Sequence, residues 1–225
     1  MPAKQFLDGI RTMVGIATRA PIVVPVGTLL TNAVTGAIEH DGTSFYTTPD
    51  TAAVGGRGVM DCAMLACQSA VATLSSATGN QRIFGTPTTG ALSVAAGTTY
   101  LIDALILVNT GTATTRTTSF NFGGTATITS IMFETGYLGA VAGTIAASQS
   151  ARFILAAGGV MNATNILASS HFKVRGVVRI NAAGTLIPQI AFSAAPGATC
   201  SIGINSFMKL TPIGNGTVNQ IGAWA

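Results

Sequence analysis

The chain has 225 residues, of which 8% are charged and 48% are hydrophobic, and its formal net charge is +4. A typical soluble domain carries about 25% charged residues, so an isolated monomer of this composition has little of the ionic surface that keeps copies apart. The composition therefore favours a tightly packed homo-oligomer, because permanent interfaces deplete charge at their centres. The alternative is a monomer whose surface is covered by Thr, Ser, Asn and Gly.

The distribution of charged and apolar residues disfavours nucleic acid and membrane as partners. The 11 Lys and Arg residues are scattered, and the one close group, Lys173, Arg175 and Arg179, is too sparse for a nucleic-acid footprint. The longest stretch without a formal charge, residues 180–208, contains two prolines and does not read as one membrane-spanning helix. Abundant β-branched residues and 27 glycines instead predict an all-β chain of short strands and tight turns.

Residues 1–20 are expected to form an N-terminal attachment segment whose structure the pattern leaves open. Phe6, Ile10 and Met13 recur at helical spacing, whereas two glycines in the segment weaken a helix. The segment is either a short helix or an extended tail that docks on a partner, with these three side chains as the expected attachment residues. It lacks the long apolar core and cleavage site of a secretory signal.

Residues 21–79 are predicted to form a β-rich connector or shaft. Short strands are expected at residues 22–26, 36–39 and 44–48. The Asp41-Gly42 pair between two of them is a hairpin turn signal. The Ala-rich stretch at 62–74 is either helical or extended, and its alternation of apolar and polar residues favours a strand.

Residues 27–48, of sequence GTLLTNAVTGAIEHDGTSFYTT, resemble a segment common in bacteriophage tail-fibre and other virion proteins. The usual pattern, GTLLT-x-P-x-x-GAIE-x-DGT-x-x-Y-x-T, has a proline where this chain has Ala33 or Val34. The resemblance implies a structural protein of a phage particle, in which the N-terminal segment attaches to another virion protein.

Residues 80–214 are predicted to form one antiparallel β-domain, followed by a C-terminal tail at 215–225. Its strands are expected at residues 81–86, 90–94, 99–109, 115–123, 126–134, 152–156, 171–181, 185–193 and 199–210. Turn signals such as Gly-Thr and Ala-Pro-Gly separate these strands at the spacing of a sandwich or barrel.

The order of short motifs in this domain resembles the C-terminal jelly-roll domain of many phage fibre and appendage proteins. The motifs include Gln81-Arg-Ile-Phe, Phe122-Gly-Gly-Thr, Val174-Arg-Gly-Val-Val-Arg and Ser206-Phe-Met-Lys-Leu. Those domains are similar to the trimeric heads of the tumour-necrosis-factor and complement-C1q type. The resemblance implies an antiparallel jelly-roll β-sandwich that forms a homotrimer.

The strand expected at residues 99–109 is the main candidate for a subunit interface. Its nearly continuous apolar run suits a strand that is buried on both faces, which is unusual in an antiparallel sheet. Burial on both faces follows if the sheet packs on its own core and on a neighbouring copy. Tyr100, Ile102, Leu105 and Leu107 are therefore the expected contacts.

The sequence lacks the residue patterns that catalysis, cofactors or metal ions require. The seven carboxylates form no catalytic constellation, and the two histidines have no acidic cluster beside them. Asp103 is interpreted as half of a structural ion pair with Arg116 or Arg175. The three cysteines are not spaced as a metal or redox motif. We therefore expect no catalytic residue, no cofactor and no metal ligand.

Composition and resemblance together predict a structural virion protein, made in the host bacterial cytoplasm, that assembles as a homotrimer with other phage proteins as partners. Trp224, the only tryptophan, is expected to pack on a neighbouring copy or on another virion protein. Two alternatives stay open. One is a knob that binds host-surface glycan or protein through loops at 110–116, 136–150 and 157–170. The other is a capsid decoration or head-fibre protein.

Overall fold

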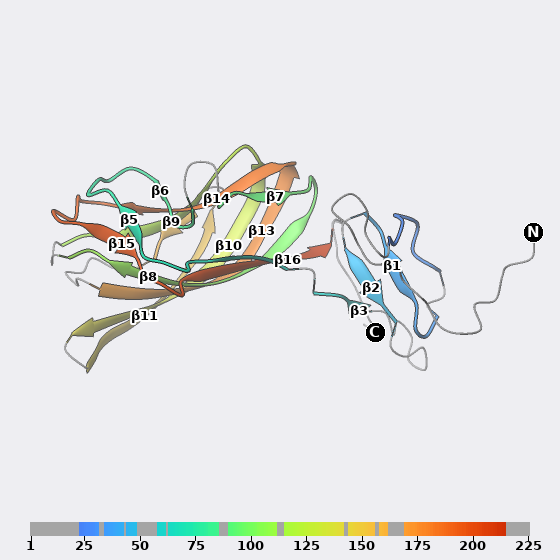
Figure 1. Cartoon of the computed structure of the whole chain (residues 1–225), viewed down its shortest axis with the longest axis horizontal. Coiled ribbons are helices and arrows are strands. Elements are labelled where there is room, and N and C mark those ends of the chain that lie inside the picture. Colours follow the sequence, from blue (N-terminus) through green and yellow to red (C-terminus); the bar gives the residue numbers. More distant parts are fainter. Residues whose placement is uncertain are drawn as a thin grey trace, which may run out of the picture.

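The computed structural model describes residues 23–31, 34–42, 44–48, 58–61, 63–85, 90–111, 115–141, 144–155, 158–161 and 169–214, with the backbone alone for 137–155 and 158. Every regular element in these ranges is a β-strand, as the composition predicts. The strands form three sheets, of three, eight and five strands (Figure 1). The expected attachment residues Phe6, Ile10 and Met13, and Trp224 in the tail, lie outside the described residues.

The smallest sheet is an antiparallel meander of β1 (Ile38–His40), β2 (Phe45–Thr47) and β3 (Gly58–Val59). The predicted hairpin turn joins β1 to β2. The Asp41 carboxylate accepts hydrogen bonds from the backbone N–H of Ser44, at 2.8 Å, and from the hydroxyl of Tyr46, at 2.7 Å. An aspartate that bonds its own turn in this way specifies the hairpin locally.

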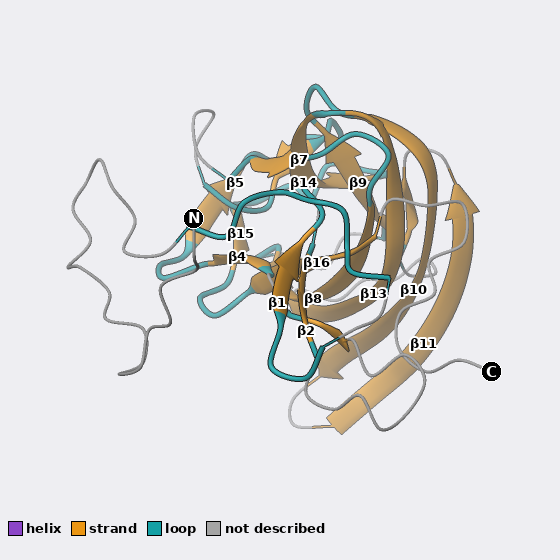
Figure 2. Cartoon of the chain, turned by 90° about the vertical axis from the view of Figure 1, so that its right-hand side faces the viewer, coloured by secondary structure: helices purple, strands orange, loops and turns teal. Residues whose placement is uncertain are grey.

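The other two sheets face each other as a β-sandwich. Their strands are β4 (Met64–Cys67), β5 (Ala72–Leu74), β6 (Gln81–Arg82), β7 (Leu92–Val94), β8 (Thr99–Asn109), β9 (Thr118–Gly123), β10 (Thr127–Val141), β11 (Thr144–Leu155), β12 (Gly158–Val160), β13 (Ser169–Ala182), β14 (Gly184–Phe192), β15 (Cys200–Ile202) and β16 (Phe207–Gly214). The five-stranded sheet has the order β12-β9-β14-β6, with β7 also paired to β14. The eight-stranded sheet has the order β11-β10-β13-β8-β15-β5, and β16 pairs with β8 and β4. Its long strands lie side by side and curve together (Figure 2).

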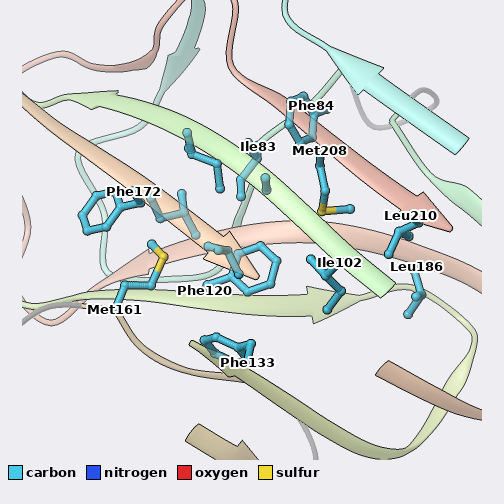
Figure 3. Close-up of a cluster of buried hydrophobic side chains, with 14 of the residues drawn as sticks. Ile83, Phe84, Ile102, Phe120, Phe133, Met161, Phe172, Leu186, Met208 and Leu210 are labelled. Atoms are coloured by element: carbon cyan, nitrogen blue, oxygen red, sulfur yellow. The ribbon is translucent and has the colours of Figure 1, made fainter. Parts of the chain in front are cut away.

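One apolar core fills the space between the two sheets (Figure 3). Phe120 of β9 and Phe133 of β10 come from opposite sheets, and their ring centroids lie 5.7 Å apart with the rings edge to face. Phe122, two residues along β9, makes a second edge-to-face contact with Phe120, at 5.0 Å. Such pairs add about 0.5–1.5 kcal/mol to the free energy of burial. The aromatic contact therefore ties the two sheets together.

The end of the predicted connector belongs to the sandwich. β4 pairs with β16 and β5 pairs with β15, so the sandwich begins at Met64 and not at residue 80. Residues 23–30 contain no strand, although one was predicted at 22–26. Both differences have the same cause, because a short apolar run becomes a strand only where another strand supplies hydrogen-bond partners.

The segment 136–150, predicted as a loop, forms most of a long hairpin instead. β10 continues to Val141 and β11 begins at Thr144. The segment is rich in Gly, Ala, Ser and Thr, which carry a weak strand signal. β13 runs along the other side of β10 as far as Gly139, however, and its backbone provides the missing partners.

The single strand predicted at 199–210 is divided into β15 and β16, which occupy consecutive stretches of one edge of β8. Asn205 between them has a positive φ of 66°. The Leu107 N–H donates to the Ser206 hydroxyl at 3.0 Å, and the Leu107 carbonyl accepts from the Gly203 N–H at 2.8 Å. The interruption therefore acts as a bulge. The Ser206 hydroxyl and the Gly203 N–H make the hydrogen bonds that the Leu107 backbone would otherwise make to a neighbouring strand.

Replacing Phe120 by Ala is expected to lower the free energy of unfolding by about 3–5 kcal/mol, because the side chain is fully buried and bridges the sheets. Urea unfolding at a fixed protein concentration measures the change. Ser119→Ala, at the adjacent outward-facing position, is the control and should change stability by less than about 0.5 kcal/mol. Equal losses in the two variants would contradict this account of the core.

Candidate functional site

Four charged residues lie in one line across the outer face of the eight-stranded sheet. Glu134 of β10 is the register partner of Arg175 of β13, Arg175 is the partner of Asp103 of β8, and Asp103 is the partner of Lys209 of β16. We call these four residues the charge row. Their signs alternate from strand to strand. Arg152 occupies the next register position on β11.

The alternation makes the charge row neutral as a whole. Neighbouring strands lie about 4.8 Å apart, so each inner charge has a neighbour of opposite sign on both sides. Among the described residues, no hydrogen bond or ion pair is found for Glu134, Arg175 or Asp103. Their charges are therefore close enough to compensate one another without being locked into fixed pairs.

Lys209 ends the charge row and has a further partner outside the sheet. Its ammonium group donates to the Asp61 carboxylate, which also accepts from the Thr211 hydroxyl at 3.2 Å. The hydrogen bond from Lys209 lowers the pKa of Asp61, with the Thr211 bond acting in the same direction. The segment before β4 is thereby connected to β16 at the end of the row.

An apolar row flanks the charge row on one side, and a mixed row flanks it on the other. On one side, Met132, Val177 and Leu101 are register partners on β10, β13 and β8. On the other side, Leu105 of β8 is the partner of Phe207 of β16 and of the exposed Lys173 of β13. Met132, Leu101 and Leu105 are about 40% exposed. An open hollow of about 580 Å³ lies over the charge row and the Met132 row.

The outer face of the five-stranded sheet has a different character. It presents mainly neutral polar side chains, among them Asn121, Gln189 and Ser93, together with Arg82, the register partner of Gln189. The Asn121 amide donates to Asn80 at 3.0 Å. In the described part of β6, β7, β9 and β14, no large hydrophobic side chain is exposed. Among the described residues of this sheet, Val160 of β12, at the sheet edge, is the one large hydrophobic side chain that is exposed. The exposed apolar surface of the sandwich strands is therefore concentrated on the eight-stranded sheet.

The four residues predicted as interface contacts do not share a face. Tyr100 and Ile102 point into the core of their own chain, where they are 4% and 3% exposed. Leu105 and Leu107 lie on the outer face. The prediction that Tyr100 and Ile102 are interface contacts is therefore wrong. Successive residues of a strand point to opposite faces, so Tyr100 and Ile102 cannot share a face with Leu105 and Leu107. The outward residue near the start of β8 is Leu101.

Asp103 was predicted to pair with Arg116 or Arg175. Arg175 is its register neighbour on β13, whereas Arg116 does not lie beside it. Arg116 is 3% exposed, and its guanidinium donates to the Thr110 hydroxyl and lies 5.7 Å from the ring centroid of Phe192. Asp103 is on the outer face and Arg116 is inside, so the sheet separates them. The Thr110 hydroxyl and the Phe192 ring are two of the groups that stabilise the buried Arg116 guanidinium.

The histidines and acidic residues of the described ranges form no metal-binding cluster. In the described ranges, no three residues among His, Cys, Asp and Glu come together to hold a metal ion. His40 stacks on Phe45 with ring centroids 4.2 Å apart, and His171 is the register partner of Leu107. The described residues also contain no helix with the length and apolarity to cross a membrane.

The cysteines differ in environment. Cys67 is exposed on β4, Cys200 is fully buried on β15, and Cys62 lies outside the described residues. Burial raises the pKa of the Cys200 thiol, and the nearby Arg116 charge opposes that rise only in part. Less thiolate is therefore present at Cys200 than at an ordinary cysteine at the same pH.

Cys200 is expected to resist a thiol-specific reagent at pH 8 in the folded protein and to react on unfolding, because its raised pKa and its burial both remove the reactive thiolate. A Cys62→Ser, Cys67→Ser variant isolates this thiol for the measurement. A Cys62→Ser, Cys200→Ser variant, which retains Cys67, is the control and should react faster. Equal native rates would mean that Cys200 is not buried.

Comparisons of the chain with protein-family models, with curated proteins and with solved structures found no match.

Proposed function

We propose that this chain is a structural protein of a bacteriophage particle, in a tail fibre, collar fibre or similar appendage, and that it acts by assembling as a homotrimer. The resemblance of residues 27–48 to virion proteins supports the phage assignment. The observation that carries the assembly role is the outer face of the eight-stranded sheet, where the exposed apolar side chains of the sandwich gather. Exposed apolar surface of this kind marks interaction sites.

We also infer that the sandwich is a jelly roll. From β7 onward the chain alternates between the sheets: β7, β9, β12 and β14 belong to the five-stranded sheet, and β8, the β10–β11 hairpin, β13 and β16 belong to the eight-stranded sheet. Eight strands that alternate between two antiparallel sheets are the arrangement expected of a jelly roll. In this interpretation the β10–β11 hairpin is an addition that widens the eight-stranded sheet.

Assembly removes the exposed Leu and Met side chains from water. Each square ångström of apolar surface buried contributes about 25 cal/mol, and a standard interface buries about 800 Å² on each partner. A sheet face with strands as long as β8 and β13 offers a surface of that order. The result is a rigid appendage in which each copy completes the surface of its neighbours.

The polar outer face of the five-stranded sheet favours a second candidate function, binding of host-surface glycan. When the apolar sheet faces meet, this second sheet is left toward solvent. Its amide side chains, such as Asn121 and Gln189, offer both donors and acceptors, which suit sugar hydroxyls. A capsid decoration or head-fibre position would use the same assembly surface, and labelling of the chain on intact particles distinguishes these positions.

The purified protein is expected to sediment at three times the 22.6 kDa of one chain, because the apolar sheet face is covered only in the assembly. Sedimentation equilibrium at micromolar concentration makes the measurement. The companion test uses antibodies to this chain, which should label purified phage particles. A stable monomer at these concentrations would contradict the proposed assembly role, and unlabelled particles would contradict the virion role.

A further inference from the structure

We propose that the meander of β1–β3, with the residues before it, is completed by the same region of neighbouring copies in the assembled trimer. We call the described residues between 23 and 60 the N-terminal module. In the assembly its exposed valine, leucine and isoleucine side chains pack against those of the adjacent copies. This inference rests on the proposed self-assembly and adds a second contact surface to it, outside the sandwich.

The N-terminal module exposes more large apolar side chains than it buries. In its described part, Tyr46 is the one large hydrophobic side chain that is buried, with 4% exposed. A small sheet is stable only when an apolar face packs on another surface. The large side chains that are at least 39% exposed are Val23, Val26, Leu30, Val34, Ile38 and Met60. The module therefore lacks the surface that would cover it.

Buried polar atoms in the module lead to the same conclusion. In the described part of the chain, the buried side-chain atoms without a hydrogen-bond partner are His40 Nδ1, Ser44 Oγ and Thr48 Oγ1, and all three belong to the module. Such an atom costs free energy, which offsets the gain from burying Tyr46. The strands are also only two or three residues long. The module by itself is therefore weakly stable, and its order depends on a further contact.

The chain holds the module on the side of the sandwich where copies are proposed to meet. Only residues 60–63 separate β3 from β4. Within this linker, Asp61 accepts hydrogen bonds from Lys209 and Thr211, which point outward because their neighbours on β16, Met208 and Leu210, are buried. The meander lies beyond the end of β16 (Figure 1). Four residues span at most about 14 Å, so the modules of copies that share the sheet face stay close together.

This short tether favours a second copy over a separate protein as the occupant. A few exposed side chains form a contact much smaller than the roughly 800 Å² per partner of a standard interface. A separate protein would lose its full translational and rotational freedom to bind so small a surface. A neighbouring copy is already held by its sandwich, and the tether gives its module a high effective concentration.

The chemistry of the module favours an apolar contact over an ionic one. Residues 23–56 contain no Lys or Arg, so this part of the chain has no cation for an anionic partner. Its described carboxylates accept hydrogen bonds within the module. Glu39 accepts from the Leu30 N–H at 2.7 Å, and Asp41 accepts from its own turn. The exposed groups that a partner can cover are therefore mainly apolar, and another module offers the same kind of surface.

Amide hydrogen exchange of the assembled protein tests this contact. The double variant Val34→Thr, Ile38→Thr keeps both side chains β-branched and replaces apolar surface by hydroxyls. Both positions are more than half exposed in one copy, so without a covering neighbour exchange in β1 and β2 should change by no more than about twofold. With the neighbour, exchange there should be about tenfold faster or more, while β8 exchanges as in the parent.

Val160→Thr is the matched control, because it makes the same substitution at an exposed position of β12, on the other sheet. It should leave exchange in β1 and β2 unchanged. Circular dichroism establishes that each variant is folded, and sedimentation establishes that it is assembled. Loss of assembly in the double variant but not in the control would support the contact in the same way. Equal exchange in the parent and an assembled double variant would overturn the inference.

A proximity measurement identifies the occupant. In a Cys62→Ser, Cys67→Ser background, Ile38→Cys carries a single pyrene label per chain, because the buried Cys200 is not labelled in the folded protein. Excimer emission from the assembled sample can then arise only between copies. We expect it for Ile38→Cys and not for Val160→Cys. Monomer emission alone from an assembled Ile38→Cys sample would show that another partner covers the module, and would overturn the inference.

The outcomes separate this inference from the proposed function. A parent chain that sediments as a monomer removes both. An assembled parent whose module shows no excimer, or exchanges equally with and without the two substitutions, overturns the contact between modules and leaves the assembly role of the sandwich standing.

Discussion

The register between β10, β13 and β8 is the constraint on which the rest of the sandwich depends. Gly176 of β13 lies opposite Phe133, and a Cβ at this position would sit 2.6 Å from the Phe133 Cβ and 2.2 Å from the Met132 carbonyl oxygen. A residue with a side chain therefore cannot occupy this place without displacing the backbone of β10. A slip by one residue would exchange the inner and outer faces of the strand. The close approach at Gly176 and the alternation of faces thus hold one register.

That single register has two consequences, one on each side of the sheet. Inside, it brings Phe133 against Phe120 of the opposite sheet and closes the core. Outside, it aligns Glu134, Arg175 and Asp103, which lie far apart in the sequence. The core and the charge row are therefore not independent features. The packing of the interior fixes the pattern that the exterior presents.

The contrast between the two outer faces gives the low charge content of the chain a structural meaning. The five-stranded sheet presents mainly amides and hydroxyls together with Arg82, and the eight-stranded sheet carries the charge row and Lys173 beside exposed Leu and Met. The exposed Leu and Met side chains favour burial of this face against another surface. On the five-stranded sheet, neutral polar groups therefore provide most of the hydrated surface, a role that charged residues have in a typical soluble domain.

Local signals in the sequence predicted much of the secondary structure. The strand at 99–109 was predicted with its observed bounds, and the Asp41-Gly42 turn lies between β1 and β2 as expected. Both are determined by neighbouring residues, either through a long β-branched and apolar run or through an aspartate that bonds its own turn. The hairpin at β10–β11 and the bulge at Asn205 were missed because each depends on a strand elsewhere in the chain.

The sequence by itself determined the all-β class, the shortage of charge and the turn positions, because composition and short-range patterns fix these properties. Only the tertiary structure decided which side of β8 faces the core and which charges stand side by side. The period of two already places Tyr100 and Ile102 on one face of β8 and Leu101 and Leu105 on the other. Which of these two faces is buried depends on the opposing sheet, because both are apolar. The alignment of Glu134, Arg175, Asp103 and Lys209 required four strands from distant parts of the chain to pair in one register.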